Sequence, residues 1–352
     1  MSTPSSQSDP AASILAAWCE AKWDEARAAA TAWDESLTAQ GTHDPRSAFA
    51  LNIGYLMAGD AARAWQYHGR ALQEAPDIEA VTAWLTDATT RYADNGWLAL
   101  VMALCLSQSG HSEDAIPHFK RAIALLPTAP QPHHFLAQVY ERAAQADMAI
   151  RSYKEAVRLD TTYTPARAAL GLLYHAQGQV ELALPHFREV VRLLPEDAVA
   201  HGMLASALAT QGKFEPALKA YKDAVRLDPR NAELRFALGK FYQDRGREQL
   251  ALQEYREAVA VDPDCSPAHT ELGWMMLEKN DMLNAMDAFN RALRADDNNA
   301  RAYLGVAKFY VSRGKREAAW QNYQKALKLE RDPQVRNNII NQLFLEGGSW
   351  DV

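Results

Sequence analysis

Large and small apolar residues recur along most of this chain with a fixed period. An aromatic residue stands at every 34th position, and an alanine stands four positions before each one. The aromatic residues are Phe119, Tyr153, Phe187, Tyr221, Tyr255, Phe289 and Tyr323, and the alanines run from Ala115 to Ala319. A period of this length predicts an array of helical repeats. Such arrays present an extended surface to partners, so the pattern favours a binding scaffold over an enzyme.

Each repeat opens with a predicted amphipathic helix, here called helix A. Its seventh position is large and apolar, its eighth is alanine or glycine, and its eleventh is bulky, as in Leu204, Ala205 and Leu208. These spacings place the apolar residues on one helical face, and the small residue allows a second helix to cross closely. The register divides the chain without insertion into 96–129, 130–163, 164–197, 198–231, 232–265, 266–299 and 300–333.

A predicted helix B completes each repeat. Glycine separates it from helix A in five repeats, while Ala144 and Asn280 take that place in the other two. A residue that tolerates positive φ ends the first helix and permits the chain to reverse. The inward face of helix B reads Ala115, Phe119 and Ala122 in the first repeat. Several of these helices stop at a proline, which lacks an amide hydrogen and clashes with the preceding turn.

This pattern of a small residue, a tyrosine, an alanine, an aromatic residue, an alanine and a proline resembles the tetratricopeptide repeat family. The resemblance covers 96–333 in seven repeats and extends to a further repeat at 45–78, where His68 replaces the aromatic residue. It implies an all-α fold, an α-solenoid in which tandem helix pairs wind into a right-handed superhelix.

The flanking segments depart from the repeat pattern. Residues 1–44 are acidic and rich in tryptophan, and 7–40 within them form a possible degenerate repeat that lacks the glycine and the aromatic residue. Residues 79–95 predict one unpaired linking helix. The apolar stripe in 334–346 predicts a capping helix, since a terminal repeat must cover its apolar face. A tail of 347–352 carries Trp350, which either folds back or is offered to a partner.

Composition and charge restrict the compartment and the partners. No apolar stretch approaches the roughly 20 residues that span a bilayer, and the polar start lacks the features of a signal peptide. We therefore expect a cytoplasmic protein without membrane insertion. Residues 1–95 hold 6 Lys and Arg against 13 Asp and Glu, whereas 96–352 hold 31 of each. A neutral array attracts phosphate backbones weakly, so we expect no nucleic-acid partner.

No pattern indicates catalysis, a metal or a cofactor. The three cysteines lack the paired spacing of metal sites or disulfide frameworks, and are interpreted as small apolar fillers. The ten histidines do not converge: His133, His201 and His269 recur at the fourth position of alternate repeats, where the family packs a bulky ring. Phosphate-binding loops and nucleophile motifs are also missing. We therefore expect a chain that is not an enzyme.

The resemblance places the partner-binding surface on helix A, which lines the concave groove in this family. Two ligand modes of the family are disfavoured, because the lysine and asparagine set that clasps a chaperone's C-terminal carboxylate is missing, as is the asparagine ladder of a sugar transferase array. The candidate groove residues occupy positions five, six and nine. They are His134, Gln138, Ala168, Leu172, Gly202, Met203, Ser206, Phe236, Lys240, Thr270, Trp274, Leu304 and Lys308.

Each groove feature has two interpretations. The small residues between Ala168 and Ala209 either admit an apolar anchor of a partner or let neighbouring helices pack tightly. Lys240, Arg301 and Lys308 alternate with Glu233, Glu271 and Glu278, a pattern that suits a partner of mixed charge or a solvated face. The N-terminal tryptophans either fill an irregular core or form a second docking surface.

Two functions follow as hypotheses. The first is an adaptor or assembly factor that binds an extended or helical protein segment in the groove, and it predicts that Gly202→Arg abolishes binding without unfolding the chain. The second is a self-associating scaffold, in which deletion of 1–44 would convert assemblies to monomers. A regulatory subunit of a partner enzyme is the remote alternative.

Overall fold

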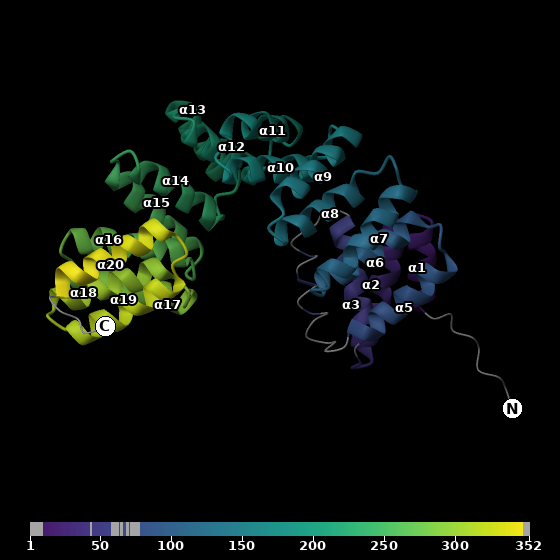
Figure 1. The fold of residues 1–352 in the computed structure, drawn as a ribbon, viewed down its shortest axis with the longest axis horizontal. Helices are drawn as coiled ribbons and strands as arrows, with labels where there is room; N and C mark the ends of the chain where they lie inside the picture. Colours follow the sequence, from purple (N-terminus) through teal and green to yellow (C-terminus); the bar gives the residue numbers. More distant parts are fainter. Residues whose placement is uncertain are drawn as a thin grey trace. The chain divides into compact units, whose positions relative to one another are not determined.

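The computed structural model describes residues 10–42, 44–57, 63, 66–67, 70 and 78–347, and among them every regular element is an α-helix (Figure 1). The chain divides into two compact units, Met1–Leu173 and Tyr174–Val352. Each unit is built from consecutive helices that pack against their neighbours in sequence. The fold is therefore all-α and assembled from tandem helix pairs, as the period predicts.

The first unit begins with three helices from the segment before the regular repeats and a fourth that leads into them. It continues with two complete helix pairs and most of α10. The bounds are α1 Pro10–Cys19, α2 Trp23–Ala39, α3 Pro45–Met57, α5 Ile78–Arg91, α6 Gly96–Gln108, α7 Ser112–Leu125, α8 Gln131–Arg142, α9 Ala146–Leu159 and α10 Thr164–Ala176.

The second unit holds the remaining repeats and a final helix. Its bounds are α11 Val180–Leu193, α12 Ala198–Thr210, α13 Phe214–Leu227, α14 Ala232–Gln243, α15 Glu248–Val261, α16 Ser266–Glu278, α17 Met282–Ala295, α18 Ala300–Ser312, α19 Arg316–Leu329 and α20 Pro333–Gly347. In this unit α12, α14, α16 and α18 are the A helices of four repeats.

The turn between helix A and helix B follows the predicted residue preference. Every residue at the breaker position has positive φ, including Ala144 at 56° and Asn280 at 60°. After α12, the amide of Lys213 donates to the carbonyl of Leu208 at 2.9 Å, and the amide of Gly212 donates to Ala209. Such bonds satisfy carbonyls that the end of a helix leaves unpaired, so the chain can reverse within three residues.

The repeated aromatic residues form the centre of each helix pair. Their exposed fractions range from 0% at Phe119 to 7% at Tyr221, and the alanines that precede them are also buried. Glycine at the eighth position of helix A makes room for the ring, because a Cβ on Gly239 would lie 2.7 Å from Cε1 of Tyr255. The rings that recur every 34 positions are therefore buried between the two helices of each pair.

The fourth position of helix A holds the loop that precedes it. Nε2 of His201 donates to the carbonyl of Pro195 at 2.9 Å, and Nε2 of His269 donates to Pro263 at the same distance. Arg235, at the same register position, donates its Nε to the carbonyl of Pro229 at 2.9 Å. These histidines thus have a structural role at the junction between repeats.

The N-terminal tryptophans that the structure describes pack into the first unit. Trp18 is buried and its ring lies 5.9 Å from that of Trp84 on α5, while Trp23 lies 5.1 Å from Trp97 on α6. Helices α1 and α2 are joined by Ala21, which adopts a φ of 55° without being glycine. Residues 10–39 therefore form a helix pair in which Trp18 and Trp33 are buried and Trp23 is half-buried.

Two predicted segments are described only in part. In the segment 45–78, α3 is described, whereas His68 and most of the following positions lie outside the described residues. At the other end, α20 contacts α19, and its buried Ile339 packs on the cluster around Tyr323. Trp350 lies outside the described residues.

Candidate protein-binding surface

The A helices of the second unit form the candidate surface. Helix α12 contacts α14, and α16 contacts α18, in addition to the contacts that each helix makes with its own helix B. We call the partly exposed side of these four helices, on which the predicted groove residues stand, the helix A surface. Eight predicted groove residues on these four helices are half-buried, namely Gly202, Met203, Ser206, Phe236, Lys240, Trp274, Leu304 and Lys308.

Two half-buried aromatic side chains form its most prominent apolar groups. The ring of Phe236 on α14 lies 5.6 Å from the buried ring of Tyr255 in the same repeat. The ring of Trp274 on α16 meets the buried ring of Phe289 edge to face at 5.7 Å. Such aromatic pairs add to the stabilisation from burial, so each surface ring rests on a rigid support from the core.

Two cations flank the ring of Trp274. The guanidinium carbon of Arg301 lies 5.4 Å from the ring centroid, and Nζ of Lys308 lies 5.2 Å from it. Both cations come from α18, whereas the tryptophan comes from α16. A cation within about 6 Å of an indole is attracted by the negative face of the ring, so Trp274 holds both basic side chains near the surface.

A buried carboxylate lies beneath this group. Glu271 is 5% exposed, and its Oε1 forms an ion pair with Nε of Arg301 at 2.9 Å. Its other oxygen accepts from Nη2 of Arg301 at 3.2 Å and from the amide of Gln243 at 3.3 Å. A buried carboxylate requires such partners, and therefore Glu271 is a compensated charge that anchors Arg301.

The remaining surface cations differ in their partners. Nζ of Lys240 lies 3.2 Å from the carboxylate of Asp244 on the same helix. Within the part of the chain that the structure describes, Lys308 has no ion pair. The group of Lys240, Arg301 and Lys308 thus outnumbers the two carboxylates that pair with it, and the uncompensated charge belongs to Lys308.

Thr270 is a predicted groove residue that the structure places in the core. It is 2% exposed, and its hydroxyl donates to the carbonyl of Ser266 at 2.9 Å. The amide of Asn299, which caps α18, donates to both the Thr270 and the Ser266 hydroxyls at 2.8 Å. This buried network joins adjacent repeats, so Thr270 supports the surface from within.

Gly202 and Ser206 make structural contacts on α12. A Cβ added to Gly202 would lie 2.6 Å from Cδ2 of Leu234 on α14. Ser206 hydrogen-bonds the hydroxyl of Tyr221, whose pKa is raised mainly by burial. Gly202 therefore packs against the next helix A, and accommodating a side chain there requires Leu234 to move. The expectation that Gly202→Arg leaves the chain folded stays a prediction.

The other four predicted residues belong to the first unit. Gln138 and Leu172 are exposed, Ala168 is half-buried, and His134 is 5% exposed. The amide nitrogen of Gln138 lies 3.2 Å from Nε2 of His134, so Nε2 accepts and Nδ1 carries the hydrogen. Burial lowers the pKa of His134 from 6.5 to about 4. His134 is therefore a neutral residue beneath the surface.

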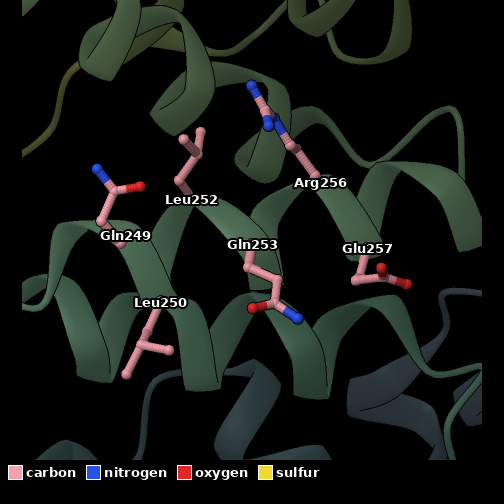
Figure 2. Close-up of a pocket in the computed structure, with 6 residues that line it drawn as sticks. All are labelled: Gln249, Leu250, Leu252, Gln253, Arg256 and Glu257. Atoms are coloured by element: carbon pink, nitrogen blue, oxygen red, sulfur yellow. The ribbon is translucent and has the colours of Figure 1, made fainter.

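A shallow hollow on α15, in the second unit, lies at residues that were not among the predicted groove residues. It is lined by α15 residues Gln249, Leu250, Leu252, Gln253, Arg256 and Glu257 (Figure 2). Leu252 and Arg256 project on one side of the helix, and Leu250 and Gln253 on the other. These positions lie outside the repeated apolar pattern of helix B, so the period gave no reason to select them. The lining includes no cysteine, histidine or serine.

Among the described residues, no group of three or more His, Cys, Asp or Glu side chains is placed to hold a metal ion. Of the described helices, none combines the length and the apolar character needed to cross a membrane.

Comparison with known families identifies the class of the protein. Two families described as "Tetratricopeptide repeat" match, one at residues 136–198 and 242–300 and the other at residues 300–333. A third, described as "TPR repeat", matches residues 205–246. Together these matches cover more than half of the chain. The chain belongs to the tetratricopeptide repeat family, whose members are protein-interaction scaffolds.

Two solved structures, Tom70 and PilF, show the same fold. Yeast Tom70 has a TM-score of 0.59 and 13% identity, covering 97% of this chain and 89% of its own. PilF from Pseudomonas aeruginosa has a TM-score of 0.51 and 15% identity, covering 60% of this chain and 97% of its own. YrrB, described as a TPR protein with an unusual peptide-binding site, has a TM-score of 0.45 and 23% identity, covering 52% and 95%. No curated protein sequence matches the chain.

Proposed function

We propose that this protein is a non-enzymatic adaptor or assembly factor that binds a segment of a partner protein on the helix A surface. The observation that carries the proposal is the pair of half-buried aromatic residues, Phe236 and Trp274, each supported by a buried ring. Tryptophan is enriched among residues that contribute most to binding. Because both rings are held in place by the core, binding would require little further ordering of these side chains.

The proposal is tested by comparing the proteins that wild-type chain and a Phe236→Ala, Trp274→Ala double variant retain from a native extract. A partner of the helix A surface should be retained by the wild-type chain and lost with the double variant. The matched control is Leu283→Ala on α17, which removes an apolar side chain that is 75% exposed but lies outside the helix A surface. Loss of the same partner with the control alone would contradict the proposal.

Self-association through the N-terminal segment is the alternative, and it requires a different variant from deletion of residues 1–44. Helix α1 contacts α6, and α2 contacts α3. Deletion would therefore expose apolar core and cause aggregation for a reason unrelated to assembly. Sedimentation of the full-length chain distinguishes the alternatives, because a scaffold of this second kind should form assemblies that Phe236→Ala, Trp274→Ala disperses.

A further inference from the structure

Position nine of helix A reads Lys240, Trp274 and Lys308 in three successive repeats, and we call these residues the Lys-Trp-Lys ladder. We propose that the ladder recognises an extended acidic protein segment, in which two carboxylates flank one apolar residue. This inference rests on the proposed function and names the chemistry of its partner. The apolar residue would pack on Trp274, and the two carboxylates would meet the lysines on either side.

The charges around the ladder favour an anionic partner. Glu271 already has Arg301 and Gln243 as partners, so its negative charge is compensated within the protein. Lys308 has no carboxylate partner among the described residues, and its Nζ lies over the ring of Trp274. A partner carboxylate would gain a charge-assisted contact with Lys308, whereas a basic partner would approach three cations.

The other carboxylates on this surface limit where the partner charge can lie. Asp244 is paired with Nζ of Lys240 at 3.2 Å. The side chain of Lys240 is nevertheless 45% exposed, so it remains accessible to a partner. Glu278 stands one turn beyond Trp274 at the end of α16, and Glu233 stands at the start of α14. Both are exposed. They would repel carboxylates placed toward the helix ends, and so they restrict an acidic segment to the middle of the helices, where the ladder lies.

The geometry of the repeats sets the spacing of the two carboxylates. Packed helices lie about 8–10 Å apart, so the Cα atoms of Lys240 and Lys308, two repeats apart, are separated by roughly 20 Å. An extended segment advances about 3.3 Å per residue. The two acidic residues should therefore be about six positions apart, with the apolar residue near the midpoint.

The apolar contact depends on a ring that the protein holds in place. Trp274 is supported by Phe289 at 5.7 Å and is flanked by Arg301 and Lys308. The methylene stems of these long side chains cover apolar surface while the charged ends remain in water. A partner side chain on Trp274 would therefore enter a site with apolar walls and a positively charged rim.

The test is selection of random twelve-residue peptides, displayed on phage, by the full-length chain. Enriched peptides should carry acidic residues about six positions apart with an apolar residue between them. The variant Lys240→Glu, Lys308→Glu should bind a synthetic enriched peptide at least about tenfold more weakly and should select basic residues instead. Lys222→Glu, an exposed lysine on α13, is the matched control and should leave binding unchanged.

A neutral variant, Lys240→Gln, Lys308→Gln, keeps the test valid if charge reversal disturbs folding, and it should also weaken binding. Raising the salt concentration should weaken binding to the wild-type chain, since exposed charges are screened. Enriched peptides without acidic residues that are still lost with Trp274→Ala would overturn the ladder proposal and leave the proposed function standing. If no peptide responds to any variant of the helix A surface, both proposals fail.

Discussion

The hydroxyl of Tyr255 donates a hydrogen bond to Oε1 of Gln243, 2.8 Å away on the other helix of the same repeat. The amide of Gln243 in turn donates to Glu271 in the following repeat. In the first unit, the hydroxyl of Tyr153 donates to Glu141 in the same register, at 2.9 Å. A ring at the centre of the core therefore positions a polar side chain at the edge of helix A, and at Tyr255 this chain of bonds reaches Glu271 beneath the helix A surface.

Tyr255→Phe should test this connection without changing the packing of the ring. We expect a loss of about 1 kcal/mol in the free energy of unfolding, because one hydrogen bond is removed and Gln243 stays accessible to water. Denaturant unfolding measures the change. A loss above about 3 kcal/mol, the range of a large core truncation, would show that the hydroxyl does more than hold Gln243.

Tyr221→Ala should remove a ring that occupies the centre of the pair formed by α12 and α13. Tyr221 is 7% exposed and its ring lies 5.3 Å from that of Phe241 in the next repeat. We expect a loss of about 3–5 kcal/mol, as for other buried aromatic residues replaced by alanine. Leu283→Ala, at an exposed position, is the control, with an expected change within about 0.5 kcal/mol. A loss below about 1 kcal/mol at Tyr221 would contradict the register.

His134 should make the stability of the first unit depend on pH. Its pKa is about 4 in the folded chain, against 6.5 for an unperturbed histidine, so the unfolded state binds more protons between these values. Above pH 6.5 the imidazole is neutral in both states, and its contribution to the free energy of unfolding is fully present. As the pH is lowered from 6.5 toward 4, the unfolded state gains a proton and the free energy of unfolding falls. The linkage amounts to up to about 3 kcal/mol.

The measurement is unfolding by denaturant at several pH values for the wild-type chain and for His134→Leu. Leucine occupies the same register position at residue 304, so the substitution suits helix A. The variant should lose less stability than the wild-type chain between pH 6.5 and 4, because the carboxylates titrate equally in both. Parallel curves for the two proteins would exclude His134 as the source of the dependence.

Gly202→Ala should destabilise the contact between α12 and α14. The added Cβ would lie 2.6 Å from Cδ2 of Leu234, which is itself buried. Overpacking of this kind typically costs about 1–3 kcal/mol. Leu234→Ala removes the atom that clashes, so the double variant should be more stable than the sum of the two single changes predicts. Additive losses would show that Gly202 does not pack against Leu234.

The predicted site could be derived from the sequence only in part. Register position identified Phe236, Lys240, Trp274 and Lys308 as surface residues of helix A, because position within a helix decides which face a side chain occupies. The same rule also selected His134 and Thr270, which are buried. Their burial depends on residues that lie just before the helix A of the next repeat, such as Tyr163 and Asn299.

The sequence by itself determined the helix pairs, their turns and their aromatic centres. These features depend on residues within one repeat, where a spacing of three or four positions and a residue tolerant of positive φ are sufficient. The contacts between repeats, in contrast, depend on how the helix pairs stack. Gln243, Glu271 and Arg301 lie in three different repeats, and Glu271 contacts both others only because stacking brings their helices together. The period of the sequence does not predict such contacts, because they depend on the length and direction of side chains across a packed interface.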